Sequence, residues 1–435
     1  MRRVAVIGSG ISGLSAAYAL SAPAERDAFD VTLFEAADYF GGHTHTVDVT
    51  LPGPRGQVTH GVDTGFLVFN HRTYPQLLRL FGELSVDTAA SDMSFSVKLP
   101  DEDLEWSGSD LNTVFAQRGN VLRPRFWRML GDILRFNRIT SAIAARGEET
   151  QLSQPIADFL AERGFGNEFR DWYFLPMIGC IWSCPTDQML RFPVATMIRF
   201  CHNHGLIQIT NRPQWHTVRG GARHYVDKML ARLPGARLST PVRRVSRGPG
   251  GATVTTDHGS QHFDEVVFAC HSDQALALLA DPSPREAELL GAIRYHANRA
   301  VLHTDASVLP KRKLAWAAWN YERASSDSRE QAAVCLHYLM NRLQPLPFEQ
   351  AVVVSLNPTR EPAAGSVLGD YDYAHPVFDL AATRAQQQLP QIQGQHHSWF
   401  CGAWTGYGFH EDGMKSGLAV AQALRATAPA ERRAA

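Results

Sequence analysis

The chain has 435 residues, of which 44% are hydrophobic, and this length accommodates two cores because domains usually span about 100 to 200 residues. Its 42 lysines and arginines nearly balance 43 aspartates and glutamates, so no global field attracts nucleic acid. No run of about 18 uninterrupted apolar residues occurs, which argues against a membrane-spanning helix.

The first forty residues predict a strand, a glycine-rich turn, a helix and a second strand. Residues 4–7 are apolar and β-branched, as in a buried parallel strand, and a helix is expected from about residue 10 to residue 20. The sequence GSGISG between them matches GxGxxG, in which successive glycines allow the turn, the approach of a pyrophosphate and close helix–strand packing. The backbone N–H groups at the helix start then face the phosphate. The residues predicted to contact a dinucleotide here are Gly8, Gly10, Ile11, Ser12 and Gly13.

Glu35 ends the second predicted strand, residues 31–34, about twenty residues after the glycines. A carboxylate at this position accepts a hydrogen bond from a ribose 2′-OH, which favours an adenosine ribose without a 2′-phosphate.

The residues after Glu35 resemble the flavin amine oxidase superfamily, which includes monoamine and polyamine oxidases, protoporphyrinogen oxidase and phytoene desaturases. The sequence AADYFGGHTHT, residues 36–46, is similar to the family's ExxxxxGG(R)xx(S/T) extension, although His43 replaces the usual arginine. Paired glycines permit close backbone approach to the ribityl and phosphate part of FAD. The resemblance implies cofactor contacts from Ala36, Gly41, Gly42, His43 and Thr44.

Further segments resemble the same family in the same order. VDTG, residues 62–65, is similar to the segment that returns the chain past the flavin, and TVRGG, residues 217–221, to the glycine pair near the isoalloxazine ring. PVRRV, residues 241–245, is similar to the strand whose backbone meets the adenine. The residues implied at the cofactor are Gly65, Phe66 and Val242.

The C-terminal region carries a second strong similarity to the family. WFCGAW, residues 399–404, resembles its FAGxE strand, with Trp404 in place of glutamate, and a glycine-rich turn and a helix through residues 416–426 follow. Asp412 is expected to be the N-cap of that helix, whose N–H groups and positive dipole end would face the flavin pyrimidine. The implied cofactor contacts are Gly402, Ala403, Asp412, Gly413 and Met414.

The cofactor segments predict an α/β protein with a discontinuous FAD-binding domain. We expect a Rossmann-like domain of the glutathione-reductase type from residues 1–75, 212–272 and 390–428, with a substrate domain of mixed sheet and helices from residues 76–211 and 273–389 and a disordered tail at 429–435. Apolar spacing predicts helices at residues 74–82, 126–139, 156–163, 169–181 and 193–204, and strands at 299–304, 314–321, 334–339 and 351–356.

The C-terminal turn supplies the candidate catalytic residues. By position, Phe409 would form an aromatic wall of the cavity, and His410 or Glu411 would act as a base near the flavin ring. The alternative, that these residues only hold the turn's own backbone, stays open.

Metal binding and redox-active cysteines are not expected. His43 and His45 lack a third ligand at a convincing spacing, so we expect no metal and a non-covalently bound FAD. Cys180 and Cys184 could form a redox pair, but their apolar neighbours favour buried packing in a reducing, cytoplasmic compartment. The amphipathic, basic stretch 126–136 could contact the inner face of a membrane, although packing against the cavity is the simpler interpretation.

The substrate is expected to be a hydrophobic small molecule or an acyl lipid. CIWSCP, residues 180–185, and the residues around 192–206 resemble a bacterial branch related to the flavoprotein domain of plant cyclopropane fatty acid synthases and to bacterial flavoproteins that dehydrogenate methyl-branched acyl chains. The resemblance implies an oxidase or desaturase of a modified fatty acyl lipid. Amine oxidation is the second hypothesis, and non-catalytic lipid binding, as in Rab GDP dissociation inhibitors, is the third. Only one dinucleotide fingerprint occurs, so electrons are expected to leave to oxygen, a quinone or a protein.

Overall fold

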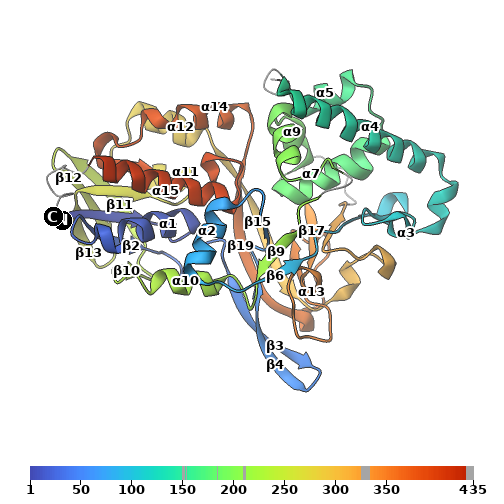
Figure 1. The fold of residues 1–435 in the computed structure, drawn as a ribbon, viewed down its shortest axis with the longest axis horizontal. Coiled ribbons are helices and arrows are strands. Elements are labelled where there is room, and N and C mark those ends of the chain that lie inside the picture. Colours follow the sequence, from blue (N-terminus) through green and yellow to red (C-terminus); the bar gives the residue numbers. More distant parts are fainter. Residues whose placement is uncertain (149–151, 153, 184, 209–211, 325–333, 428–435) are drawn as a thin grey trace.

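The computed structural model describes all residues except 149–151, 153, 184, 209–211, 325–333 and 428–435, so Cys184 and the expected tail at 429–435 lie outside the described residues. Two large sheets lie at opposite sides of the molecule (Figure 1). The expected α/β fold class, with a mixed second sheet, is confirmed.

A five-stranded parallel sheet forms the first part. Its strand order is β10-β2-β1-β14-β20, and its strands come from segments far apart in the chain. Strands β1, β2, β14 and β20 are buried at their carboxyl ends because both faces of the sheet are covered there, whereas the edge strand β10 is partly exposed. Their bounds are β1 Arg2–Ile7, β2 Phe29–Phe34, β10 Ala236–Arg237, β14 Glu265–Phe268 and β20 Ser398–Phe400.

Each face of this sheet has its own hydrophobic core, because successive side chains of a strand point to opposite faces. Val4 and Val6 of β1 face one core, and Ala5 and Ile7 face the other. The first core is covered by α1 Ile11–Leu20, α2 Pro75–Leu84, α10 Arg223–Leu230 and α15 His410–Ala426. The second is covered by the meander β11 Val242–Gly248, β12 Gly251–Thr256 and β13 Gly259–Phe263, and by α11 Ser272–Leu278, α12 Pro284–Gly291 and α14 Leu380–Gln388.

The part of the molecule that packs on the five-stranded sheet includes residues outside the stretches expected for the FAD-binding domain. Leu289 and Leu290 of α12 and Ala382 and Ala385 of α14 share a core with the five-stranded sheet, although they lie within 273–389, which was expected to form the substrate domain. The apolar spacing of a helix shows that one of its faces is buried but does not show which sheet that face covers. The packing of α12 and α14 on the five-stranded sheet was therefore not predicted from the sequence.

A seven-stranded mixed sheet forms the second part, in the order β19-β15-β18-β17-β16-β7-β8. All neighbours are antiparallel except β16 and β7. Its strands are β7 Phe95–Leu99, β8 Leu104–Ser107, β15 Arg294–His303, β16 Trp319–Glu322, β17 Cys335–Leu339, β18 Val353–Leu356 and β19 Val367–Val377.

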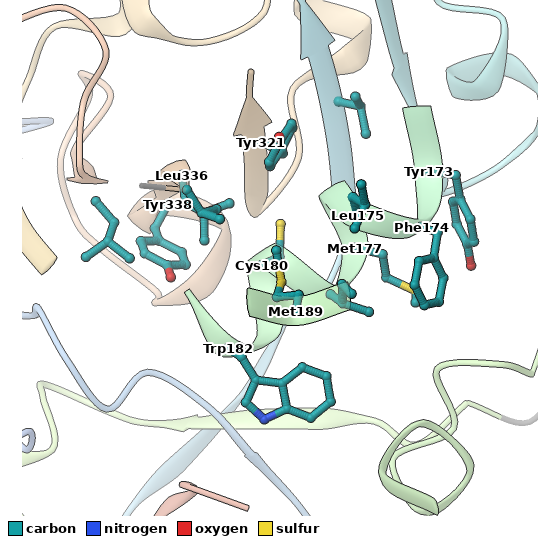
Figure 2. Close-up of a cluster of buried hydrophobic side chains, with 14 of the residues drawn as sticks. Tyr173, Phe174, Leu175, Met177, Cys180, Trp182, Met189, Tyr321, Leu336 and Tyr338 are labelled. Carbon is teal, nitrogen blue, oxygen red and sulfur yellow. The ribbon is translucent and has the colours of Figure 1, made fainter. Parts of the chain in front are cut away.

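Helices cover one face of this sheet and bury a large aromatic core. Tyr321, Leu336 and Tyr338 project from the sheet toward Cys180 and Trp182 of the covering helices (Figure 2). Cys180 is buried and its surroundings are apolar, as expected for a packing role. The helices are α4 Pro124–Arg146, α5 Ile156–Glu162, α6 Asn167–Phe169, α7 Leu175–Trp182, α8 Thr186–Leu190 and α9 Val194–Asn203.

Short antiparallel pairs connect the two parts. A hairpin of β3 Thr46–Gly53 and β4 Gly56–Asp63 projects from the molecule (Figure 1), and β9 Trp215–Val218 lies between β5 Phe69–Asn70 and β6 Thr88–Ser91.

Three local predictions were wrong in detail. The helix expected at residues 169–181 contains a π-helical turn at Arg170–Phe174, because Pro176 lacks the N–H that would continue the regular ladder. The strand expected at 314–321 begins only at Trp319, since Lys313–Ala315 forms a 3₁₀ turn. Asp412 is not an N-cap: α15 begins at His410, and Asp412, in its first turn, accepts the backbone N–H of Phe409 at 3.1 Å.

Candidate active site

The glycine-rich turn leaves open space where the cofactor phosphates are expected. Gly8 has φ +103°, and a Cβ on Gly13 would lie 1.9 Å from the carbonyl oxygen of Gly8. Those two glycines therefore serve the turn and the packing of α1 on β1. A Cβ on Gly10 would meet no described atom within 4 Å, so this glycine borders a gap that a ligand can fill.

Glu35 fixes the turn from the end of β2. Its carboxylate accepts the backbone N–H of Ser9 at 2.9 Å, the hydroxyl of Ser9, and the N–H of Ala37 at 2.9 Å. The N–H of Thr240 donates to the backbone carbonyl of Glu35 at 2.7 Å and brings Val242 to the same end of the sheet. The predicted ribose and adenine positions therefore lie next to each other, at the carboxyl end of β2.

The paired glycines after Glu35 bring a second backbone segment against the first. Gly41 and Gly42 have φ of +119° and +58°, and a Cβ on Gly42 would lie 3.1 Å from Cα of Gly10. The N–H of Gly41 donates to Oγ of Ser9 at 3.0 Å. The two segments that the sequence assigned to one dinucleotide are thus in contact.

His43 lies in a buried cluster of aromatic rings. Its ring centre is 5.1 Å from Tyr373, 5.4 Å from His375 and 6.3 Å from His271. Burial, and then the nearby His271, lower the pKa of His43 to about 4, so the ring is neutral near pH 7. Its Nε2 atom is buried without a hydrogen-bond partner among the described residues. Such an atom is costly unless a ligand pairs with it, so the glycine cradle and His43 together fit a bound dinucleotide.

The segment after β4 closes on the same cluster. A Cβ on Gly65 would lie 2.2 Å from the carbonyl oxygen of His43, which also accepts the N–H of Phe66 at 2.6 Å. His45 is held by two hydroxyl groups: its Nδ1 lies 3.0 Å from Oγ1 of Thr64 and 3.1 Å from the Tyr373 hydroxyl.

His410 is held between the two glycine segments and α10. Its ring stacks on Phe66 with centroids 3.8 Å apart, and its Nε2 lies 2.7 Å from the hydroxyl of Tyr225, which is 2.6 Å from Oγ1 of Thr44. Burial, and then His43, lower the pKa of His410 to about 3. The His410 ring is therefore uncharged near pH 7, and its Nε2 already has a hydrogen-bond partner.

Phe409 faces the helical part of the molecule. Its ring stacks on Phe200 of α9 at 4.7 Å, and Phe200 in turn lies 4.9 Å from Trp182 and 4.0 Å from His204. The role of Phe409 as an aromatic wall against a substrate stays a prediction.

Glu411 contacts a helix N-terminus. Its carboxylate accepts the N–H groups of Gln76 and Leu77 at 3.0 and 3.1 Å, in the first turn of α2. Asp412 is engaged similarly by Tyr407 and Phe409. These bonds favour the interpretation in which both acids hold the backbone of the turn. A role of Glu411 as a base stays a prediction.

The N-terminus of α15 lies against that of α1. A Cβ on Gly413 would lie 2.8 Å from Ile11, and one on Gly417 would lie 2.1 Å from the carbonyl oxygen of Ser12. Met414 is buried in the core that α1 and α15 share. The preceding turn is fixed by Oγ of Ser416, which accepts the N–H of Gly402 at 2.9 Å. Ala403 follows and begins a short 3₁₀ turn.

Trp404 has a structural role at the family's glutamate position. Its indole N–H donates to the carbonyl of Cys270 at 3.1 Å, and its ring is buried in the second core of the five-stranded sheet. The segments from both termini therefore converge, as expected.

A cavity of about 580 Å³ opens beside the turn that leads into α15. It lies between the starts of α2 and α15 and the end of α9, and its lining includes Tyr74, His204, Tyr407, Phe409 and Lys415. The sequence did not single out Tyr225, Tyr373 or His375 for this region, because they lie on elements distant in the chain and no spacing rule connects them to His43.

The chain matches the model of the family described as flavin containing amine oxidoreductase over residues 11–347. The chain belongs to this family. It is 26% identical over 294 residues to the putative flavin-containing monoamine oxidase AofH of Mycobacterium tuberculosis, a match that covers 64% of this chain and 59% of that protein. The chain thus spans about three fifths of the length of this curated relative.

Two solved structures show the same fold at low identity. A CLA-producing fatty acid isomerase from P. acnes has a TM-score of 0.65 at 14% identity, covering 97% of this chain and 98% of that one. Putrescine oxidase bound to putrescine has a TM-score of 0.65 at 16% identity, covering 98% and 99%. Family membership implies a flavin, and the glycine cradle and the orphaned Nε2 of His43 are compatible with FAD.

Proposed function

We propose that this protein is an FAD-dependent oxidoreductase that oxidises a modified fatty acyl lipid, with FAD bound non-covalently. The observation that supports the acyl substrate is the aromatic wall made by the stacked rings of Phe409 and Phe200, of which Phe409 lines the cavity. The rings of His410 and His43, on the side of the glycine segments, are uncharged near pH 7 because their pKa values are low. An alkyl chain gains from burial against uncharged aromatic rings. One structural neighbour acts on a fatty acid, which supports the same substrate class.

Amine oxidation is the alternative, because other neighbours oxidise amines. An alkylammonium substrate needs a compensating anion or an open aromatic cage. The carboxylates nearest the turn, Glu411 and Asp412, are each bonded by two backbone N–H groups. Lys415 lies 3.7 Å from Glu411 and offsets part of the negative charge of that acid, whereas Lys98 and Lys228 bond to groups elsewhere in the molecule. This arrangement favours a neutral substrate.

The chain's own residues hold and orient the reactants. The N–H groups at the start of α15 and the glycine turn before α1 would bind the anionic parts of FAD. When bound, FAD supplies the hydride-accepting centre. Phe409 and Phe200 would exclude water and hold the acyl chain, and the Tyr225 hydroxyl would keep His410 in one orientation through its bond to Nε2.

Anaerobic flavin absorbance of the purified protein tests the substrate. Phospholipids with methyl-branched or cyclopropane acyl chains should bleach the flavin, whereas unmodified phospholipids, putrescine and benzylamine should not. Bleaching by amines alone would establish the alternative, and an unchanged spectrum with every compound would remove support for both. Return of the oxidised spectrum on adding oxygen or a quinone would then identify the acceptor.

Phe409→Leu provides a site-specific check. Loss of the stacking on Phe200 should slow flavin reduction roughly tenfold without changing the oxidised spectrum, since an aromatic pair contributes about 0.5–1.5 kcal/mol beyond its buried area. Phe263→Leu, in the remote meander core, is the matched control and should leave the rate unchanged. A colourless protein that binds lipid would instead indicate the non-catalytic binder.

A further inference from the structure

The tip of the helical part exposes a group of large apolar side chains. Leu122, Leu111, Leu134, Trp127 and Val121 are exposed by 86%, 77%, 57%, 51% and 46%, and all come from the short helix α3 Leu111–Val114, the 3₁₀ turn η3 Arg118–Leu122 and helix α4. We call these five residues the apolar tip. Figure 1 shows α3 at the end of the molecule remote from the five-stranded sheet.

Two members of the apolar tip, Trp127 and Val121, are bonded to each other. The indole N–H of Trp127 donates to the carbonyl of Val121 at 2.8 Å, and the Trp127 ring lies 5.3 Å from Phe115, the C-cap of α3. Trp127 and Leu134 are seven residues apart on α4 and therefore share one helical face. The opposite face buries Phe126, Met129 and Phe136 in the aromatic core that also contains Phe200.

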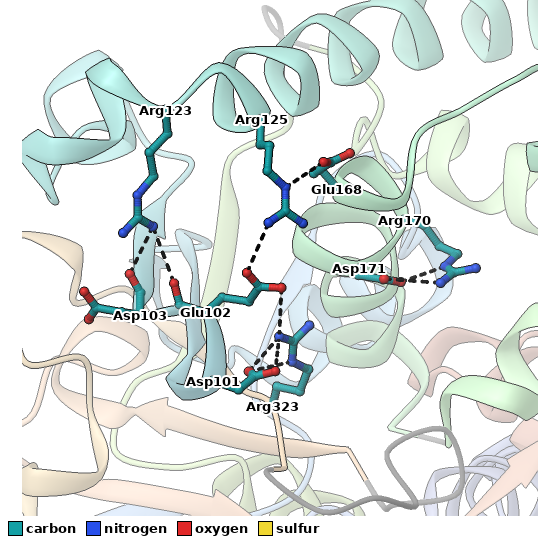
Figure 3. A network of polar contacts seen from close by, with 9 residues as sticks. All are labelled: Asp101, Glu102, Asp103, Arg123, Arg125, Glu168, Arg170, Asp171 and Arg323. Atoms are coloured by element: carbon teal, nitrogen blue, oxygen red, sulfur yellow. Dashed lines mark hydrogen bonds and ion pairs between the residues drawn. The ribbon is translucent and has the colours of Figure 1, made fainter.

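The same segment is strongly basic, although the whole chain has a net charge of only −1. Residues 111–146 contain seven arginines and a single acid, Asp132. Arg123 and Arg125 are held by residues of the 100–103 turn and by Glu168 (Figure 3), and these contacts fix the start of α4 on the sheet. Among the described residues, no carboxylate lies within 4 Å of the guanidinium groups of Arg118, Arg128 or Arg138.

An anionic bilayer surface is the partner that satisfies both features. Nucleic acid would pair with arginines but gives no reason for exposed leucine and valine, whereas a leucine- and tryptophan-bearing helix with arginines beside it is typical of interfacial insertion. Arginine side chains extend toward headgroups while their stems cover apolar surface. No helix of the described residues is long and apolar enough to cross a bilayer, so such contact would be peripheral.

We propose that the apolar tip and the arginines beside it dock this protein on an anionic membrane surface, with Leu122 and Trp127 inserted among the acyl chains and Arg118 and Arg138 at the headgroups. This deepens the proposed function, because α4 links the docked surface to the aromatic wall of the cavity through one shared core. An acyl substrate would then be taken from the bilayer.

Co-sedimentation of the full-length flavoprotein with vesicles tests the surface directly. The protein should bind phosphatidylglycerol-containing vesicles and bind pure phosphatidylcholine vesicles much more weakly, with binding reduced by high salt. Leu122→Asp and the double change Arg118→Glu, Arg138→Glu should each weaken binding roughly tenfold or more. Flavin absorbance and circular dichroism of both variants should match the unchanged protein.

Matched controls place equivalent changes on other surfaces. Leu380→Asp, at the exposed start of α14, and the double change Arg26→Glu, Arg55→Glu should leave vesicle binding unaltered. Equal loss in these controls, no binding to anionic vesicles, or binding of nucleic acid or an acidic protein through the same arginines would overturn the proposal. Vesicle binding without flavin reduction by acyl lipids would reject the proposed substrate while leaving the docking surface supported.

Discussion

Asp63 and Gln344 form a reciprocal pair of hydrogen bonds between the two parts of the molecule. The backbone N–H of Asp63 donates to Oε1 of Gln344 at 3.0 Å, and Nε2 of Gln344 donates to Oδ2 of Asp63 at 2.7 Å. The same carboxylate accepts the N–H of Ala222, at the start of α10, at 2.9 Å. Asp63 therefore connects the end of the β3–β4 hairpin, the α10 turn and the second part of the molecule at one buried point.

Gln344→Ala should destabilise the protein by about 2 kcal/mol, because an unsatisfied buried group costs about 1–3 kcal/mol. The change leaves the buried backbone N–H of Asp63 without a partner and removes one of the two donors to Oδ2, which still accepts the N–H of Ala222 at 3.1 Å. The urea denaturation midpoint reports this loss. Gln350→Ala, at an exposed position, is the control and should not shift the midpoint. A midpoint for Gln344→Ala equal to that of the unchanged protein would show that the Asp63–Gln344 pair contributes nothing to stability.

Asp63 should also make stability depend on pH near neutrality. Burial raises the pKa of Asp63 to about 7 even though Thr46, Ala222 and Gln344 lower it by hydrogen bonding. A carboxyl whose pKa is higher in the folded state stabilises the fold most below its unfolded value of about 3.8, and this contribution is lost as pH rises through about 7. Asp63→Asn should therefore be least favourable relative to the unchanged protein at pH 4–5, with the difference shrinking toward pH 8. A constant difference in melting temperature across that range would contradict the raised pKa.

Gly42→Ala should weaken FAD binding roughly fivefold or more. Gly42 has φ +58°, which costs a side chain about 1–2 kcal/mol, and the new Cβ would press within 3.1 Å of Cα of Gly10. The measurement is flavin absorbance per protein after dialysis, and FAD titration of the apoprotein. Gly82→Ala, whose Cβ would meet no described atom within 4 Å, serves as the control. Full flavin retention in Gly42→Ala would show that this turn does not touch the cofactor.

The glycine-rich turns could be predicted from sequence because the constraints on them are local. Gly8, Gly13 and Gly42 are each required by backbone geometry within a short segment, and such requirements recur as a readable pattern. The match between Trp404 and the family's glutamate could be located, but its hydrogen bond to Cys270 could not.

Contacts between distant segments were predicted less completely, because no local pattern connects the residues that make them. His375 contacts His43 across more than three hundred residues, and Glu411 caps α2 across a similar distance. Periodicity identifies buried positions on each element but gives no information about which element lies opposite. The same limit hid the cofactor-side packing of α12 and α14.

The histidines around His43 should make the fold sensitive to mild acid. Burial, followed by neighbouring histidines, lowers the pKa values of His43 and His271 to about 4 and those of His375 and His410 to about 3. Because the unfolded chain binds protons near pH 6.5 and the folded chain does not, stability is lost as pH falls from about 6.5 toward 4. His375→Gln should flatten the fall in melting temperature over this range. The exposed His258→Gln should keep it, and identical slopes for all three proteins would exclude the cluster as the cause.

His337 should impose the opposite dependence at alkaline pH. Its Nε2 lies 2.9 Å from Glu322 and 3.4 Å from Sγ of Cys335, and its Nδ1 lies 2.6 Å from Oγ of Ser355. Burial alone would lower the pKa of His337, but Cys335 and Glu322 outweigh burial and raise it to about 9.

The stability that His337 contributes is fully present below about pH 6.5 and is lost as pH rises through about 9. His337→Gln should therefore lower the melting temperature at pH 7 but change it little at pH 10, where the unchanged protein has lost the same charge. The ligand atoms of Glu322, Cys335 and His337 lie within 4.8 Å of one another, so the melts need a chelator. Glu322 is already paired, because Nζ of Lys98 lies 3.1 Å from its carboxylate. We therefore expect the melting curves to be the same with and without the chelator. An equal effect of His337→Gln at both pH values would show that the imidazole is neutral in the fold.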